Sequence, residues 1–189
     1  VKVHYAGVNP VDWKMREAGP LHLAYKLIGP RGPFVTGVDF AGEVIEVGAS
    51  AGMAVGTRVV GGTNFARGQL GSYADEVIVR PDQVAVIPAS VSFDAAACLP
   101  VAAVTPWIAL TEHRTTGPGH RVLVLGAAGG VGLFGIQLAQ MLGAKAVGVC
   151  SGRNVALVER LGAVAIDYGQ GDALEAARAH GPYDLVLHM

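Results

Sequence analysis

The chain has 189 residues, of which 51% are hydrophobic and 15% are charged, and its formal net charge is -1. This length fits one large or two small domains. A nearly neutral chain has no basic surface for nucleic acid, so we expect no nucleic-acid partner. The longest apolar stretch, residues 95–110, is interrupted by Pro100 and Pro106, which favours a buried helix and loop over a membrane span. The two cysteines, Cys98 and Cys150, are too few for a disulfide framework and predict a cytoplasmic protein.

Residues 1–90 consist of short β-like runs separated by glycine-rich turns. The runs are Val1–Tyr5, Gly42–Gly48, Arg58–Val60 and Tyr73–Val79. Regularly spaced short strands with such turns predict a small all-β, barrel-like domain.

From residue 91 the pattern changes to an alternation of strands and helices. Ser92 is placed to cap a helix at the start of this part. We expect strands at Val122–Leu125, Ala146–Cys150, Val164–Asp167 and Asp184–His188, and helices at Gly130–Leu142, Asn154–Leu161 and Asp172–His180. Right-handed crossovers wind such a series into a parallel sheet, so residues 91–189 predict a partial doubly wound α/β domain. The first and last runs, 1–5 and 185–189, are cut inside strands, which indicates a piece of a longer protein.

The most informative segment is the glycine turn Gly126–Gly132, which follows a strand and opens a helix. This order suits the pyrophosphate of a dinucleotide, because the chain turns sharply and no Cβ keeps the backbone from the phosphates. The helix dipole adds attraction for an anion. We therefore predict cofactor binding by Ala127, Ala128, Gly129, Gly130, Val131 and Gly132, with a merely structural glycine turn as the alternative.

The end of the second strand of this domain indicates which dinucleotide is bound. An NAD site usually has an acidic residue there for the ribose hydroxyl. Here the strand ends in Ser151, followed by Arg153 and Asn154, with no carboxylate to repel a 2′-phosphate. A guanidinium suits a phosphate, and Tyr168 ends the neighbouring strand, so the pattern predicts NADPH. In the alternative interpretation, Ser151 or Asn154 caps a helix, Arg153 is a surface charge and Tyr168 packs at the sheet end.

Five segments together resemble the medium-chain dehydrogenase/reductase superfamily, and within it the zinc-independent quinone oxidoreductases. They are Ala6–Asp12, Gly37–Val44, Gly71–Ala74, Leu99–Ala102 and Gly126–Gly132. The resemblance implies a GroES-like substrate domain over residues 1–90, lacking its beginning, and a Rossmann domain over 91–189, lacking its C-terminal half. It also implies an active site in the cleft between such domains.

Zinc ligands are missing where zinc-dependent relatives have them. Those relatives carry a cysteine in the segment that matches residues 7–9 and a His-Glu pair in the segment that matches 37–39. This chain has Asn9 in the first place and Val38 and Asp39 in the second. Zinc needs thiolate or imidazole donors at fixed geometry, so we expect no metal.

Without a metal, the reaction that remains is hydride transfer from NADPH to a quinone or an α,β-unsaturated carbonyl, which needs mainly alignment. By the resemblance, Asn9 lies near the nicotinamide or the substrate carbonyl, Lys14 near the cofactor and Thr105 beside the nicotinamide. Asn9 and Tyr73 are our catalytic candidates, although the proton donor stays unidentified. The alternatives are that Asn9 shapes a turn, Lys14 is a solvated helix charge and Thr105 caps a helix.

Other function classes stay open at this point. One is a non-catalytic NADPH-binding or regulatory protein of the same fold, and another is an enoyl reductase module of a biosynthetic assembly. The expected partner is a small-molecule quinone or enone, with no membrane, and a homodimer is compatible with the sequence.

Overall fold

The computed structural model describes residues 1–49 and 52–188, which divide into two compact units. The first unit spans Val1–Val101 and the second begins at Ala102. From the sequence we place the division after residue 90. In the structure helix α3 (Phe93–Ala97) packs on the strands of the first unit, so residues 91–101 belong with that unit. Met189, the end of the predicted second domain, lies outside the described residues.

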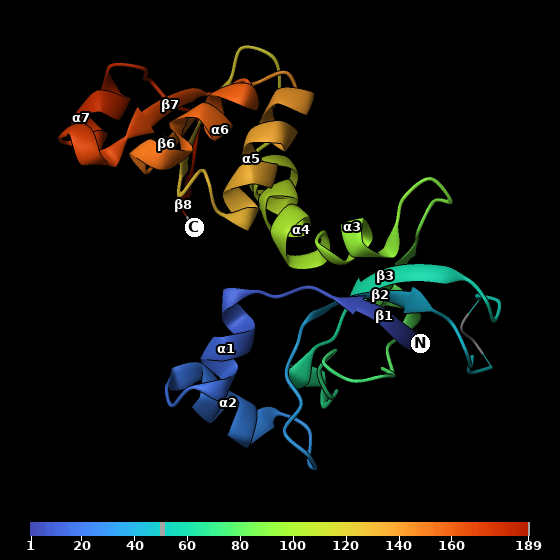
Figure 1. Ribbon diagram of the computed structural model, residues 1–189. Helices are drawn as coiled ribbons and strands as arrows, with labels where there is room; N and C mark the ends of the chain where they lie inside the picture. The colour runs from blue at the N-terminus through green and yellow to red at the C-terminus, as the bar shows by residue number, and fades with distance from the viewer. Residues whose placement is uncertain (50–51, 189) are drawn as a thin grey trace. The chain divides into compact units, whose positions relative to one another are not determined.

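The first unit is built on a four-stranded antiparallel sheet in the order β1-β2-β3-β4, three strands of which are labelled in Figure 1. Its strands are β1 (Lys2–Ala6), β2 (Asp39–Glu43), β3 (Arg58–Gly62) and β4 (Val84–Val86). Consecutive residues of β2 point to opposite faces: Phe40 packs with Val59, whereas Ala41 packs with Ile87 and Ala96. The predicted β domain is confirmed, and its strands pair in antiparallel fashion.

Two of the predicted strands are wrong in position. The run Gly42–Gly48 is a strand only in its first two residues, because β2 begins at Asp39 and ends at Glu43. The segment Tyr73–Val79 forms no strand, and its pairing with β1 is an isolated bridge between Lys2 and Glu76.

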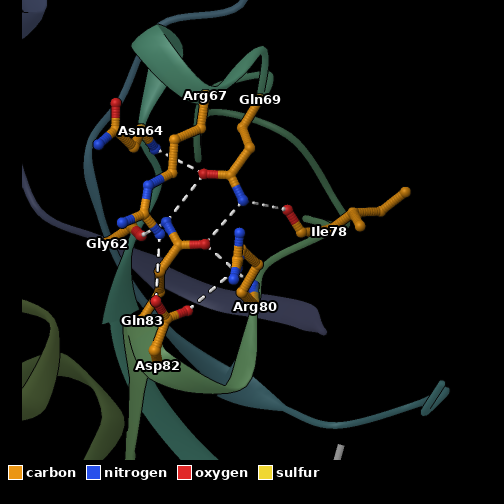
Figure 2. Close-up of polar contacts among 8 residues, drawn as sticks. All are labelled: Gly62, Asn64, Arg67, Gln69, Ile78, Arg80, Asp82 and Gln83. Carbon is orange, nitrogen blue, oxygen red and sulfur yellow. Dashed lines mark hydrogen bonds and ion pairs between the residues drawn. The ribbon is translucent and has the colours of Figure 1, made fainter. Parts of the chain in front are cut away.

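Side chains replace strand pairing beyond that bridge, as Figure 2 shows. Gln69 donates from Nε2 to the carbonyl of Ile78 at 3.2 Å, and the carboxamides of Gln69 and Gln83 bond each other reciprocally at 2.8 Å. Beside them Asp82 forms ion pairs with Arg67 and Arg80, with nitrogen–oxygen distances of 3.2 and 3.4 Å. This network joins the segment after β3 to the segment before β4.

Two helices of the first unit escaped prediction. They are α1 (Pro10–Arg16) and α2 (Pro20–Ile28), each of which begins with proline. Proline favours the first helical position because its fixed φ suits the helix and its missing N–H would be unpaired there. The helices have seven and nine residues, too few for a clear helical periodicity.

The second unit is a parallel sheet in the order β7-β6-β5-β8 with helices on both faces. Its strands are β5 (Arg121–Leu125), β6 (Lys145–Cys150), β7 (Val164–Asp167) and β8 (Leu185–His188), and its helices are α5 (Gly130–Met141), α6 (Val155–Arg160) and α7 (Ala173–Arg178). Helix α4 (Pro100–Ile108) precedes them. The predicted doubly wound α/β series is confirmed, and each predicted bound is within two residues of the observed one. Among the described residues, no helix combines the length and the apolarity that a membrane span needs.

The sheet of the second unit is buried on both faces, as its continuous apolar strands require. Val122 and Val124 of β5 pack with α5 and α6 on one face, and Leu123 packs with Ala177 of α7 on the other. Gly148 of β6 lies beneath α5 and α6, where it leaves room for Ala127.

Gly148→Ala should therefore destabilise the protein. A Cβ at Gly148 would lie 2.7 Å from the Cβ of Ala127 and 2.9 Å from Cγ1 of Val158, both inside the core. Overpacking of this kind costs about 1–3 kcal/mol, which denaturant unfolding can measure. Gly117→Ala is the matched control, because nothing lies within 4 Å of its added Cβ. Equal stability of the two variants would contradict the packing described here.

Candidate functional site

The glycine turn of the second unit has the geometry that a dinucleotide phosphate requires. Gly126 makes the turn with φ +78°, and the nitrogen of Gly129 donates to its carbonyl at 3.0 Å. A Cβ on Gly132 would lie 2.3 Å from the oxygen of Gly126, so only glycine lets α5 approach the end of β5 this closely. Ala127 is fully buried below the turn. The turn therefore leaves the beginning of α5 open toward a ligand.

The beginning of α5 also offers hydrogen-bond donors. The first intrahelical bond runs from Leu133 to the carbonyl of Gly129, the N-cap residue. The N–H groups of Gly130, Val131 and Gly132 have no partner among the described residues. Together with the helix dipole, such N–H groups form a site for an anion. Ala128 lies within the same turn.

The carboxyl end of β6 carries three of the predicted specificity residues. Asn154 donates from Nδ2 to Oγ of Ser151 at 3.0 Å, so these two side chains hold the loop that joins β6 to α6. Arg153 is exposed and forms no ion pair with the described residues. Tyr168 follows β7 and is 59% exposed. The guanidinium and the phenol are both accessible to a ligand.

The sequence missed one acidic neighbour of this loop. β6 and β7 pair with Cys150 opposite Asp167, which places Asp167 beside the loop after β6. A Cβ on Gly152 would lie 2.5 Å from Oδ2 of Asp167. The expectation that no carboxylate lies near the end of β6 is therefore wrong. Residues of the neighbouring strand reach this point because parallel strands end at the same edge of a sheet.

The first unit contains a second cluster, formed around two buried carboxylates. Asp12 and Asp39 are only 3% and 1% exposed. The backbone nitrogen of Asn9 donates to Asp12 at 2.7 Å, and Nδ2 of Asn9 donates to Asp39 at 3.0 Å. The nitrogen of Val101 donates to the same Oδ2 atom of Asp39 at 3.1 Å. Asn9 therefore bonds both carboxylates.

Tyr73 belongs to the same cluster. Its hydroxyl donates to Oδ2 of Asp12, with an O–O distance of 3.0 Å, and lies 3.3 Å from the carbonyl of Gly7. Burial of the hydroxyl raises the pKa of Tyr73 to about 12, and the hydrogen bond to Asp12 adds to this rise. Tyr73 is consequently a neutral phenol at physiological pH, and its proton points at Asp12.

Each carboxylate of the pair has one oxygen for which the described residues provide no hydrogen-bond partner. These atoms are Oδ1 of Asp12 and Oδ1 of Asp39, and both are buried. Burial raises the pKa of the Asp39 carboxyl above its ordinary value. The hydrogen bonds from Asn9 and Val101 lower that pKa in part, and the nearby charge of Asp12 raises it further. The balance of these contacts leaves the pKa of the Asp39 carboxyl above its ordinary value.

The sequence contained a separate local signal for each aspartate but none for the pair. Asp12 stands three residues after Asn9, the spacing of a helix capping box, and Asp39 interrupts an otherwise apolar run. The two aspartates are 27 positions apart in the chain, so the sequence does not indicate that they lie close together.

The remaining predicted residues lie outside these clusters. Lys14 is on α1, and its Nζ lies 5.6 Å from the centre of the Trp13 ring. Thr105 is an exposed residue of α4. Within the described residues, no three His, Cys, Asp or Glu side chains gather in a way that could hold a metal ion.

Known proteins share both the sequence and the fold of this chain. Residues 1–89 match the alcohol dehydrogenase GroES-like domain. The chain is 35% identical to the human mitochondrial NAD(P)H oxidoreductase RTN4IP1, in an alignment that covers 99% of this chain and 50% of that protein. The solved quinone oxidoreductase of Coxiella burnetii has a TM-score of 0.87 and 35% identity over 98% of this chain and 57% of its own. The Escherichia coli quinone oxidoreductase, solved in complex with NADPH, has a TM-score of 0.78 and 30% identity over 95% and 52%.

The chain belongs to the medium-chain dehydrogenase/reductase superfamily. It spans about half the length of the relatives that it matches. One of those relatives is named as mitochondrial, so the cytoplasmic location stays a prediction.

The raised pKa of Asp39 makes the stability of this superfamily member depend on pH. The folded-state pKa lies above the unfolded value of 3.8, so the contribution of Asp39 is complete below that value and is lost as the pH rises through the folded pKa. Asp39→Asn removes this titration. As the pH rises above the unfolded value, the free energy of unfolding of the unmodified protein should fall relative to that of the variant, until Asp39 is ionised in the folded protein as well. A series of denaturant titrations measures the difference.

Asp75→Asn is the matched control, because it removes one exposed carboxylate from the same unit. The raised pKa would be ruled out if the free energies of unfolding of the Asp39 variant and the unmodified protein differed by the same amount at every pH.

Proposed function

We propose that the protein is an NADPH-dependent oxidoreductase that transfers a hydride to a quinone or an α,β-unsaturated carbonyl without a metal. The observation that carries this proposal is the Gly126–Gly132 turn with its open N–H groups at the start of α5. A Cβ at Gly132 would collide with the backbone of Gly126 and Ala127, so glycine here lets α5 begin against the turn, as a dinucleotide site of this kind requires. The names of the relatives support a nicotinamide cofactor and a quinone acceptor.

The chain's own residues have separate tasks in this proposal. When bound, NADPH supplies the hydride together with its electron pair. The N–H groups of Gly130 and Val131 bind the pyrophosphate, and the guanidinium of Arg153 binds the 2′-phosphate. Asn9 binds a polar group of the cofactor or the acceptor, and a proton from solvent completes the reduction of the acceptor. Lys14 and Thr105 are proposed as further cofactor contacts.

The site of Asn9 supports a reaction without a metal. In the places where zinc-dependent relatives have ligands, this chain has a carboxamide and a buried carboxylate whose hydrogen bonds go to each other. A carboxylate occupied in this way is a poor zinc ligand, because zinc sites in this superfamily rely on thiolate and imidazole donors. Reduction of an electron-poor acceptor needs alignment more than a Lewis acid.

The preference for NADPH is the part of the proposal most open to test, since Asp167 lies near the proposed 2′-phosphate position. Arg153→Ala should weaken NADPH binding by about 1–3 kcal/mol and change NADH binding little, because only NADPH carries the phosphate that the guanidinium binds. Titrations that follow nicotinamide fluorescence measure both affinities.

Arg160→Ala is the control for this experiment, since it removes an exposed arginine from the far end of α6. Equal losses of NADPH and NADH affinity in the Arg153 variant would overturn the 2′-phosphate role. Tight binding of NADH by the unmodified protein would instead indicate that Asp167 accepts a hydrogen bond from the ribose. Binding of neither nucleotide would refute the oxidoreductase proposal.

A further inference from the structure

Two charges of opposite sign lie at the loop that follows β6 in the second unit. Arg153 belongs to the loop itself, and Asp167 reaches the loop from the end of β7, where it is the strand partner of Cys150. Among the described residues, neither of the two side chains forms an ion pair, with the other or with any third residue. The protein therefore neutralises neither charge, and a ligand bound at this loop experiences both.

Gly152 allows the carboxylate of Asp167 to lie against the loop. A Cβ at Gly152 would be 2.5 Å from Oδ2 of Asp167 and 3.2 Å from its carboxyl carbon. Gly152 is not among the glycines with a positive φ, so its backbone conformation does not itself require glycine. The close approach of the carboxylate does require it, because any side chain would push the carboxylate or the loop away.

The carboxylate of Asp167 is held in place but keeps free acceptor capacity. Oδ1 accepts from the nitrogen of Gly169 at 2.9 Å, and Oδ2 accepts from Nε2 of Gln170 at 3.4 Å. A carboxylate has about four acceptor positions, so these two bonds leave room for a ligand. Burial raises the pKa of the Cys150 thiol, and the charge of Asp167 raises it further, so this charge acts at the end of β6.

The adenosine ribose of a dinucleotide lies at this end of the sheet. In a doubly wound domain an Asp or Glu at the end of the second strand bonds the ribose 2′-hydroxyl. The second strand here is β6, and the residue that follows it is Ser151, whose Oγ accepts from Asn154 at 3.0 Å. The negative charge at this place therefore comes from Asp167 on the neighbouring strand.

We propose that Asp167 is a specificity-determining residue of the nucleotide site, whose carboxylate opposes a ribose 2′-phosphate and limits the preference for NADPH that Arg153 provides. The inference rests on the proposed function and stays within the second unit. A phosphate monoester carries between one and two negative charges at neutral pH, so the carboxylate repels it. The uncharged 2′-hydroxyl of NADH is not repelled and can donate a hydrogen bond to the carboxylate. The protein should therefore bind both nicotinamide dinucleotides.

The test measures the affinity of the full chain for 2′-phospho-ADP-ribose and for ADP-ribose, which lack the nicotinamide and differ only in the phosphate. Asp167→Asn should bind 2′-phospho-ADP-ribose about three- to tenfold more tightly, the size expected for a repulsion between charges at a hydrated surface. It should bind ADP-ribose no more tightly. Asparagine keeps the size of the side chain and an oxygen that can accept from Gly169, so the substitution removes mainly the charge. Titration calorimetry measures the four affinities.

Glu175→Gln is the matched control, because it removes one exposed carboxylate from α7 in the same unit. This variant should bind both ligands as the unmodified protein does. An equal gain in Glu175→Gln and Asp167→Asn would attribute the effect to net charge and overturn the role of Asp167.

A double variant tests whether Asp167 acts on the phosphate directly. Relative to Arg153→Ala alone, the combination of Arg153→Ala with Asp167→Asn should still gain affinity for 2′-phospho-ADP-ribose. A gain that disappears without the guanidinium would mean that Asp167 acts through Arg153, which contradicts the proposal.

A further measurement needs no substitution at Asp167. In Arg153→Ala, phosphorus nuclear magnetic resonance can follow the titration of bound 2′-phospho-ADP-ribose. The carboxylate should raise the pKa of the second ionisation of the bound 2′-phosphate above that of the free ligand, because a like charge disfavours the dianion. A pKa equal to or below that of the free ligand would refute the proposal even if Asp167→Asn does not fold.

The results for the unmodified protein separate this inference from the function on which it rests. If the unmodified protein binds neither ligand, the proposed function itself is refuted. If it binds both and Asp167→Asn brings no gain for 2′-phospho-ADP-ribose, only the role of Asp167 is refuted.

Discussion

The removal of two carboxylates from water governs the arrangement of the first unit. Burial of a carboxylate costs several kcal/mol unless hydrogen bonds and charges offset it. No cationic side chain among the described residues pairs with Asp12 or Asp39, so hydrogen bonds alone compensate for the burial. The donors come from the start of α1, from Tyr73 and from Val101 at the start of α4. Three segments far apart in the chain are thereby fixed around one small polar cluster.

The same cluster gives Tyr73, a catalytic candidate from the sequence, a different task in the structure. The hydroxyl of Tyr73 is bonded to Asp12, and the pKa of Tyr73 is raised to about 12. A phenol in that state stabilises a buried carboxylate more readily than it gives up a proton. The polar groups of the first unit thus support one another.

In the second unit, close packing at two glycines governs the arrangement of the turn and the helix. Gly132 permits α5 to approach the end of β5, and Gly148 permits Ala127 to lie beneath the turn. Each glycine removes a side chain at a point where the backbone or a neighbouring methyl group already fills the space. The result is a row of N–H groups without partners among the described residues at the start of a twelve-residue helix, which is an electrostatic feature produced by packing.

The sequence by itself determined the order of strands and helices in the second unit, the glycine turn and the candidate residues Asn9 and Arg153. These features depend on hydrophobic periodicity and on turn chemistry, which act between residues close together in the chain. Only the tertiary structure decided that Asp39 lies beside Asn9, that Tyr73 lies beside Asp12, and that Asp167 lies against Gly152. The physical reason is that these contacts join residues 15 to 61 positions apart, and long-range strand pairing and packing bring them together without leaving a local pattern.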